Sequence, residues 1–189
     1  MASERELEKK WLLTQLPKLP EDEFEILSVQ TFSQYYLSPT ERVRVIDDHG
    51  IKGSNRKWIE HFTKTIPDGN GASIEERTVI KESEYHLLLP YFKKKVEKIR
   101  TTWVHIESGL HYEFDYIPLG GAFSQDNKTS ILVILEIEFQ EFYMNIEEVN
   151  EKFILPSFME QYVLLDATGL KQFSNYNLAN KINETILYK

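Results

Sequence analysis

The stretch ELEKK (Glu6–Lys10) decides the fold that the sequence predicts. Side chains of a β-strand alternate between two faces, so on a strand Glu6, Glu8 and Lys10 point to one side and Leu7 points to the other. Two carboxylates and an amine therefore share one face of the first predicted strand, with an apolar residue behind them. We ask what lies on the side to which these charges point.

Charged residues recur two positions apart on most of the later predicted strands, so the members of each pair also share a face. Acidic and basic pairs are largely segregated onto different strands, whereas an ordinary solvated face mixes the two signs. The pairs are Arg42 and Arg44 in ERVRV, Glu75 and Arg77 in IEERT, Lys98 and Arg100 in VEKIR, Glu113 and Asp115 in YEFDY, and Glu136 and Glu138 in ILEIEF, with Lys64 alone in HFTKT.

Hydrophobic alternation with a period of two dominates the chain and predicts an antiparallel α+β fold. A closed barrel would remove the exposed edges that so many strands otherwise present. Helical spacing predicts three helical segments, at 82–97 with a break near Pro90, at 146–153, and from Ser174 onward with Leu178, Ile182 and Ile186 buried. The predicted strands are Arg5–Leu13, Leu27–Leu37, Glu41–Asp47, Lys57–Thr65, Ile74–Ile80, Val96–His105, Leu110–Ile117 and Ile131–Gln140.

The segregated charges indicate two kinds of ligand. Carboxylate oxygens are the ligands of hard cations such as Mg²⁺ and Mn²⁺. Arginine and lysine bind phosphate oxygens, arginine as a bidentate fork and lysine as a point charge. Together they are typical of a site for a metal-bound polyphosphate. The alternative is a sheet with one solvated face, which is the ordinary origin of any single charged pair.

Composition narrows the class of protein. The chain has 189 residues, a formal net charge of −8 and no cysteine. The length suits one domain over residues 1–189. The acidic balance disfavours duplex nucleic acid as a partner, and the lack of cysteine excludes disulfides and thiolate chemistry. No apolar run reaches membrane-spanning length and the first residues are too charged for a signal peptide, so we expect a cytoplasmic protein without a membrane partner.

Most aromatic residues are expected to serve packing. Strand alternation assigns Tyr35 and Tyr36 to packing positions. The three tryptophans, Trp11, Trp58 and Trp103, are expected in the core or on the outside of the sheet beneath helices. No base-binding pocket is evident in the sequence.

The segment ELEKKWLL resembles the Glu-x-Glu-x-Lys signature that opens the CYTH domains, also called triphosphate tunnel metalloenzymes. Later segments are similar to the successive strands and tail of that family, in the order QYYL, RVR, TK, VEKIR, EFD, LEIEF and LKQFSN. The resemblance covers the chain from Arg5 to Ala179. It implies an eight-stranded antiparallel barrel that forms a tunnel with its charged faces inward, flanked by a few helices.

The resemblance also implies roles for individual residues, with Mg²⁺ or Mn²⁺ as the cofactor. Glu6, Glu8, Glu136 and Glu138 match the metal-binding carboxylates, and Glu6, Glu8, Lys10 and Lys98 are the expected catalytic residues. The expected substrate-binding residues are Arg42, Arg44, Lys64, Glu75, Arg100, Glu113, Asp115 and Lys171. One position departs from the family, because Arg77 stands where a second carboxylate is common. Either a metal ligand is lost there, or the register slips by one and Glu76 faces inward.

The resemblance implies a metal-dependent hydrolase of triphosphates, and the small inorganic tripolyphosphatases of the family are the most similar in size and motif order. The partner that the resemblance implies is a small-molecule triphosphate. Whether the protein forms a homodimer is left open by the sequence. Thiamine triphosphatase and class IV adenylate cyclase activities are alternatives in the same fold. A binding module that holds polyphosphate or nucleotide without catalysis is a further alternative, and Arg77 keeps it open.

Overall fold

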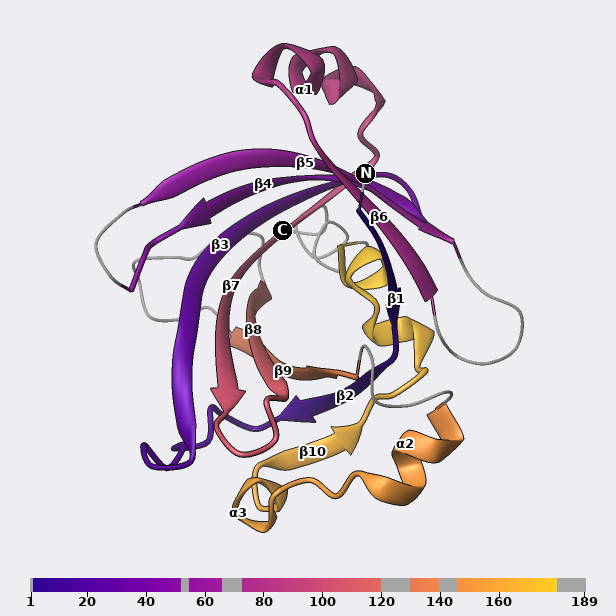
Figure 1. The fold of residues 1–189 in the computed structure, drawn as a ribbon. Helices are drawn as coiled ribbons and strands as arrows, with labels where there is room; N and C mark the ends of the chain where they lie inside the picture. The colour runs from indigo at the N-terminus through magenta and orange to yellow at the C-terminus, as the bar shows by residue number, and fades with distance from the viewer. Residues whose placement is uncertain (1, 52–54, 66–72, 120–129, 140–145, 180–189) are drawn as a thin grey trace.

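The computed structural model describes residues 2–51, 55–65, 73–119, 130–139 and 146–179 (Figure 1). Within these ranges the side chains of residues 2–6, 73, 119, 130 and 146 are not described. Ten strands form one sheet. They are β1 (Ala2–Glu6), β2 (Glu8–Leu13), β3 (Phe24–Ser38), β4 (Glu41–Asp48), β5 (Arg56–Thr65), β6 (Ser73–Val79), β7 (Lys94–His105), β8 (His111–Leu119), β9 (Ser130–Glu138) and β10 (Val163–Asp166).

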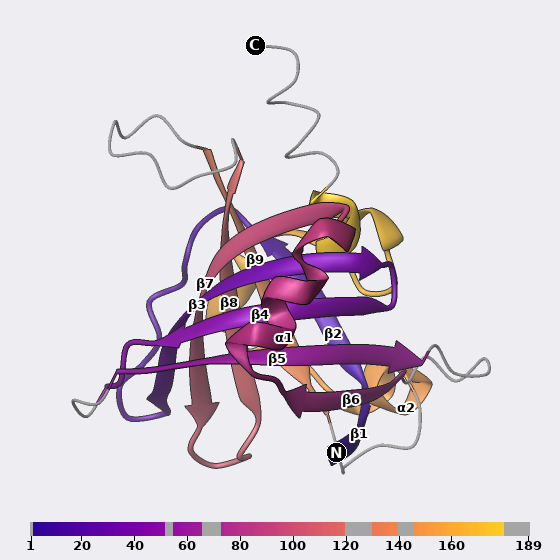
Figure 2. The same cartoon turned by 90° about the horizontal axis from the view of Figure 1, so that it is seen from above.

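The strands follow the order β1-β6-β5-β4-β3-β7-β8-β9-β2-β10, and every neighbouring pair is antiparallel. The sheet wraps around a central space, which Figure 1 views end on and Figure 2 views from above. Short helices lie outside the curved sheet. They are α1 (Glu82–Leu88), α2 (Ile146–Lys152) and α3 (Ser157–Glu160), together with the 3₁₀ turn η1 (Leu89–Tyr91). The 3₁₀ turn η2 (Lys171–Phe173) instead lies at the central space, where Lys171 lines the cavity described below.

The expected eight-stranded closed barrel is wrong in detail, because among the described residues ten strands form the sheet and hydrogen bonds do not close it into a ring. The first predicted strand is split at Leu7. Before Leu7 the chain pairs with β6, and after it Glu8 lies opposite Glu138 of β9. The other edge of β2 pairs with β10, a strand that the sequence did not predict. Since β10 occupies that edge, β6 has no place beside β2, and the two sides of the sheet are joined through the chain at Leu7.

The predicted strands otherwise have counterparts, within a few residues at their ends. The helix predicted at 82–97 is wrong over residues 94–97, because these residues form the start of β7 and pair with β3. Helical structure is described at 175–179, and Leu178 is buried as expected. The predictions for Gln140, Ile182 and Ile186 lie outside the described residues.

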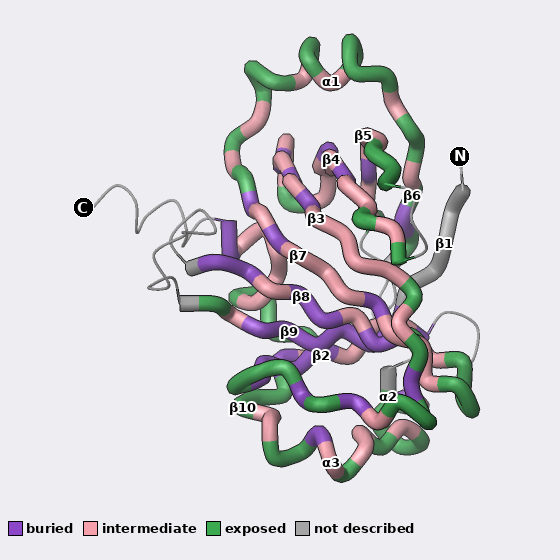
Figure 3. The backbone as a smooth tube through the Cα atoms, turned by 90° about the vertical axis from the view of Figure 1, so that its left-hand side faces the viewer, coloured by how far each residue is buried: buried purple, intermediate pink, exposed green. Residues whose placement is uncertain are grey.

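The main hydrophobic core lies between the outer face of the sheet and the helices α2 and α3. It includes Trp11, Phe114, Leu135, Val149 and Met159. Trp11, Phe114 and Leu135 occupy alternate positions of β2, β8 and β9, so the charged residues between such positions face the central space. In Figure 3 buried backbone runs along β2, β8 and β9, consistent with a sheet covered on its outer side there.

A second apolar cluster includes Leu12, Tyr36 and Ile134 from the strands and Leu178 and Ala179 from the C-terminal segment. Leu12 follows Lys10 by two residues and Ile134 precedes Glu136 by two, so both lie on the same face as those charges. The inner face therefore changes from charged to apolar along the strands. Within the described residues, no helix is long and apolar enough to cross a membrane.

Candidate functional site

A cavity of about 820 Å³ opens inside the curved sheet. It receives side chains from β2 through β9 and from the segment that follows β10. Ten of the thirteen residues expected at the site from the β-strands line it, as does Lys171. They are Glu8, Lys10, Arg42, Arg44, Lys64, Glu75, Arg100, Glu113, Glu136 and Glu138. Glu6 ends β1, but its side chain is outside the described part.

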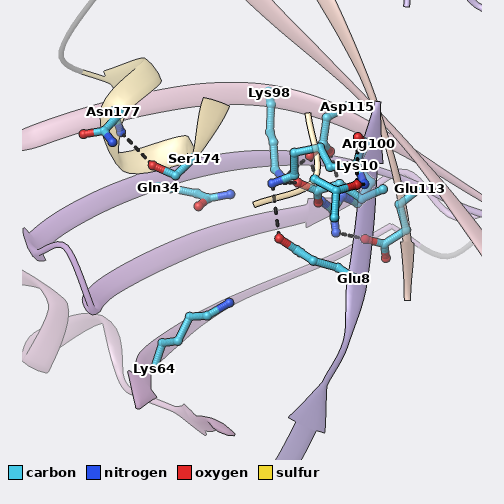
Figure 4. Close-up of polar contacts among 12 residues, drawn as sticks. Glu8, Lys10, Gln34, Lys64, Lys98, Arg100, Glu113, Asp115, Ser174 and Asn177 are labelled. Carbon is cyan, nitrogen blue, oxygen red and sulfur yellow. Dashed lines mark hydrogen bonds and ion pairs between the residues drawn. The ribbon is translucent and has the colours of Figure 1, made fainter. Parts of the chain in front are cut away.

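Arg100 is the centre of the acidic side of the cavity. Its guanidinium donates to Asp115 through Nε and Nη2, at 2.6 and 2.7 Å, and through Nη2 to Glu136 at 2.5 Å. Nη1 donates to Glu113. Burial opposes the charge of Arg100, but these carboxylates hold its pKa well above the ordinary arginine value. Arg100 is thus engaged by three carboxylates, and Figure 4 shows it gathered with Glu113 and Asp115.

Lys98 and Asp115 lie behind this wall and are not among the described residues that line the cavity. Both are almost fully buried, and Lys98 Nζ lies 2.5 Å from Asp115 Oδ2. Burial and the nearby Arg100 lower the pKa of Lys98 to about 8. Lys98, expected to be catalytic, and Asp115, expected to bind substrate, are thus buried beside Arg100, and Asp115 holds the Arg100 guanidinium in place.

Lys10 bridges carboxylates of two strands. Its Nζ lies 2.7 Å from Glu136 and 3.4 Å from Glu8. Burial opposes its charge, but Glu136 and Glu8 keep its pKa above the ordinary lysine value. Burial likewise opposes the charge of Glu136, but Lys10 and Arg100 hold the pKa of that carboxyl well below its usual range. Both side chains therefore stay charged at neutral pH.

The pKa of Glu138 is shifted in the opposite direction from that of Glu136. Burial and the neighbouring Glu113 raise its pKa to about 7. In the strand register Glu138 lies directly opposite Glu8, and Glu113 lies directly opposite Glu136. Like charges opposite one another across a sheet are unfavourable. The carboxylates of Glu8, Glu113, Glu136 and Glu138 are therefore crowded together on this wall.

This raised pKa predicts a pH-dependent stability. The folded state binds one more proton than the unfolded state between the ordinary pKa of 4.5 and about 7, so the contribution of Glu138 to stability falls as pH rises through that window. Glu138→Gln should raise the melting temperature by roughly 3–8 °C at pH 8 and by less at pH 6. Thermal denaturation of both proteins at the two pH values measures this. Glu76→Gln, on the exposed outer face of β6, is the control, and an equal gain at both pH values would contradict the assignment.

Three arginines gather over one aromatic ring on the other side of the cavity. The guanidinium carbons of Arg42, Arg44 and Arg77 lie 3.5, 4.5 and 5.8 Å from the centroid of Phe62. Burial and the neighbouring Arg42 lower the pKa of Arg44 to about 10, which still leaves it charged at neutral pH. The Nε atoms of Arg42 and Arg44 are buried and have no hydrogen-bond partner among the described residues. This arrangement is typical of a site for an anion.

The strand β6 settles the register that the sequence left open. Glu75 is buried and Glu76 is exposed, so Glu75 and Arg77 face the cavity and no slip occurs. Glu75 lies 3.2 Å from Lys64 Nζ and 3.4 Å from Arg77 Nη2. Arg77 therefore adds to the cationic side at the position where a second carboxylate was expected. Figure 4 shows Lys64 standing apart from the cluster around Arg100.

The segment after β10 contributes the remaining wall. Thr168 accepts a hydrogen bond from the backbone nitrogen of Lys10 at 3.1 Å, which holds the segment against β2. Asn177 Nδ2 donates to the carbonyl of Lys171 at 2.6 Å. Lys171, Asn177 and Tyr176 line the cavity, and the ring of Tyr176 packs against Tyr36 at 5.4 Å. Figure 4 shows Ser174 and Asn177 together at this side of the site.

Sequence reasoning missed several residues of the cavity wall. Tyr36 lines it and donates to Gln34 at 3.1 Å, although packing alone was expected. Trp58 also faces the cavity, and its Nε1 donates to Glu60 at 2.8 Å. Alternation could have found both, because Trp58 and Glu60 share the face of Lys64 on β5, and Tyr36 lies opposite Arg42. Apolar character had assigned Trp58 to the core or the outside instead.

The donor set of the acidic wall suits a hard cation, since Glu8, Glu136 and Glu138 all offer carboxylate oxygens to the cavity. Among the described side chains, however, no three carboxylate or imidazole groups form a metal-binding cluster. The carboxylate lining and the lack of a preformed three-ligand cluster are both compatible with Mg²⁺ or Mn²⁺. Mg²⁺ is often held by one or two carboxylates plus substrate phosphates rather than by a cage of protein ligands.

Comparisons with known proteins identify no family. No family model and no curated protein matches the chain. Among solved structures, the PH1819 protein from Pyrococcus horikoshii OT3 is similar with a TM-score of 0.44 and 21% identity, covering 77% of this chain and 82% of that chain. A chain of the Schizosaccharomyces pombe Mediator head module gives a TM-score of 0.45 and 10% identity, covering 77% and 88%. Likeness at this level carries no conclusion about activity.

Proposed function

We propose that this chain is a metal-dependent triphosphatase that binds a linear triphosphate in the central cavity, and that its wrapped sheet is a variant of the triphosphate tunnel that the sequence resembles. One observation carries the proposal: Arg42, Arg44 and Arg77 converge over Phe62 on one side of a cavity whose opposite side is acidic. An anion with several charges neutralises the first side, and a cation bound to that anion would neutralise the second.

The chain's own residues would hold and orient the phosphates. Arg42 and Arg44 carry buried Nε–H groups that lack a partner among the described residues, and these can donate to phosphate oxygens. Lys64 is half-buried beside Glu75 and adds a flexible ammonium. Fixing the triphosphate between such donors brings it close to in-line geometry for attack by water, which is the main requirement of phosphoryl transfer.

The acidic wall would hold the metal. Glu8 and Glu138 lie directly opposite one another, and Glu136 is adjacent. A bound Mg²⁺ or Mn²⁺ supplies charge neutralisation at the phosphate oxygens. Lys10, charged and positioned by Glu136, can donate to the same phosphate group, and Arg100 keeps the carboxylates of the wall in place. No side chain needs to act as a covalent nucleophile.

Phosphate release from tripolyphosphate tests this proposal, with Mg²⁺, with Mn²⁺ and with a chelator. We expect metal-dependent release that falls at least about 100-fold in Glu8→Gln, because a ligand of the metal is lost. Glu76→Gln makes the same chemical change on the exposed face of β6 and should keep wild-type activity. Release that is insensitive to chelator, or an active Glu8→Gln, would refute the metal-dependent mechanism.

A non-catalytic polyphosphate-binding module is the second candidate. It is favoured by the engagement of the acidic wall with Lys10 and Arg100, together with the presence of Arg77 on the cationic side. This candidate predicts that tripolyphosphate raises the melting temperature without being consumed.

A further inference from the structure

The connection between β6 and β7 is apolar in sequence but is not buried. Residues 87–92 read LLLPYF, and none of these six apolar residues is buried. The exposed fractions of Leu87, Leu89 and Tyr91 are 73%, 39% and 67%. Figure 1 shows α1 standing outside the sheet, and in Figure 3 the backbone of this connection is largely exposed. We call residues 87–92 the apolar segment.

Aromatic contacts hold this connection on the outer face of the sheet. The ring of Phe92 stacks on Tyr35 of β3 at 5.0 Å, and Tyr85 of α1 meets the ring of Tyr35 edge-on at 5.7 Å. The carboxylate of Glu84 accepts a hydrogen bond from the backbone nitrogen of Lys81 at 2.7 Å, which caps the start of α1. The helix is therefore fixed on one side by its own chain, while its two leucines and its second tyrosine stay exposed.

This distribution of apolar residues differs from that of an ordinary surface helix. A surface helix is apolar on the side that packs against its own protein and polar on the side that faces water. Here Tyr85 and Phe92 supply the first side, and Leu87, Leu89 and Tyr91 occupy the second. Large apolar side chains gathered on the surface of a folded protein mark an interaction site. The exposed side therefore needs a partner that covers it.

Charges of opposite sign flank the apolar segment. Glu82 and Glu84 lie in the first turn of α1, before the segment, and both are exposed. Lys81 offsets one of these two carboxylates, so this flank keeps a net negative charge. Lys93 follows directly after the segment and is also exposed. The surface is therefore acidic at its beginning, apolar in the middle and basic at its end.

We propose that the partner is a second copy of this chain, and that two apolar segments pack antiparallel about a twofold axis. In a twofold dimer both copies use the same patch, so the patch must be complementary to itself. Antiparallel packing meets this condition, because it brings Glu82 and Glu84 of each copy beside the partner's Lys93. An anionic membrane surface fits less well, since the two carboxylates would face headgroups of the same sign.

Sedimentation velocity over a range of about 1 to 200 μM protein tests the dimer, because a small interface predicts reversible association at micromolar concentration. Leu87→Glu and Tyr91→Glu should each raise the Kd of the dimer at least about 30-fold, since the symmetry removes every contact twice. Ile154→Glu is the matched control. It introduces the same charge at an exposed apolar residue after α2, and it should change the Kd less than about twofold.

A charge exchange tests the antiparallel arrangement. Glu82→Lys and Lys93→Glu should each raise the Kd about fivefold or more, and the double variant, whose net charge equals that of the wild type, should recover most of the affinity. A folding defect would not be repaired in this way. A protein that stays monomeric at every concentration, whether or not it binds phosphatidylserine vesicles, would overturn the proposal. A dimer that persists in Leu87→Glu and Tyr91→Glu, or a double variant without recovery, would overturn it as well.

Discussion

Arg44→Met should weaken tripolyphosphate binding about 30-fold or more and at the same time raise the melting temperature of the ligand-free protein. Binding falls because charge-assisted hydrogen bonds to phosphate are lost, each worth about 1.5–3 kcal/mol. Stability rises because burial and the neighbouring Arg42 already disfavour the charge of Arg44, as its lowered pKa of about 10 records. Methionine keeps the apolar contact with Phe62 while removing that cost.

Calorimetry and thermal denaturation measure the two effects separately. Arg56→Met is the matched control, since Arg56 is an exposed arginine on β5 and its loss should change both quantities little. The opposite signs are the diagnostic feature, because damage to the fold would lower affinity and stability together. Unchanged affinity in Arg44→Met would show that the arginines do not form the anion site.

Asp115→Ala should destabilise the fold by about 3–5 kcal/mol, the usual cost of removing one partner from a buried ion pair. Asp115 is fully buried and holds both Lys98 and Arg100, so alanine leaves two buried cations without that carboxylate. The melting temperature should fall by roughly 6–20 °C. Thermal and urea denaturation at pH 7 check this value.

Two further variants locate the origin of that loss. Lys98→Met should cost less than Asp115→Ala, because Asp115 keeps its contacts with Arg100. Asp22→Ala removes an exposed aspartate and should change stability by less than about 0.5 kcal/mol. A loss in Asp115→Ala no larger than in Asp22→Ala would contradict the supporting role assigned to this carboxylate.

Strand alternation made much of the candidate site predictable from the sequence. The positions of Glu75, Arg42, Arg44, Glu113 and Glu136 on one face follow directly from their two-residue spacing. The apolar residues between them were expected in the core, and Phe114 and Leu135 are indeed buried on the other face. The charged face of each strand thus did not depend on knowing the order of the strands.

Long-range pairing was not predictable in the same way. The pairing of β10 with β2 accompanies the change of strand partner at Leu7. The short apolar sequence of β10 carries no pattern that identifies its neighbouring strand. Lysines at 93–95 look compatible with a solvated helix, but the segment 94–97 pairs with β3. The depth at which each side chain is buried could not be predicted either. Lys98 and Arg100 share a face of β7, but of the two only Arg100 lines the cavity. Depth depends on the curvature of the sheet, which alternation does not encode.

The most direct test of the central claim is a calorimetric titration of the wild-type protein with tripolyphosphate, in the presence and absence of Mg²⁺. We predict saturable binding of one tripolyphosphate per chain, with affinity that falls as salt concentration rises, because the site is built from arginine and lysine. No binding at millimolar tripolyphosphate under either condition would contradict the assignment of the cavity as a triphosphate site.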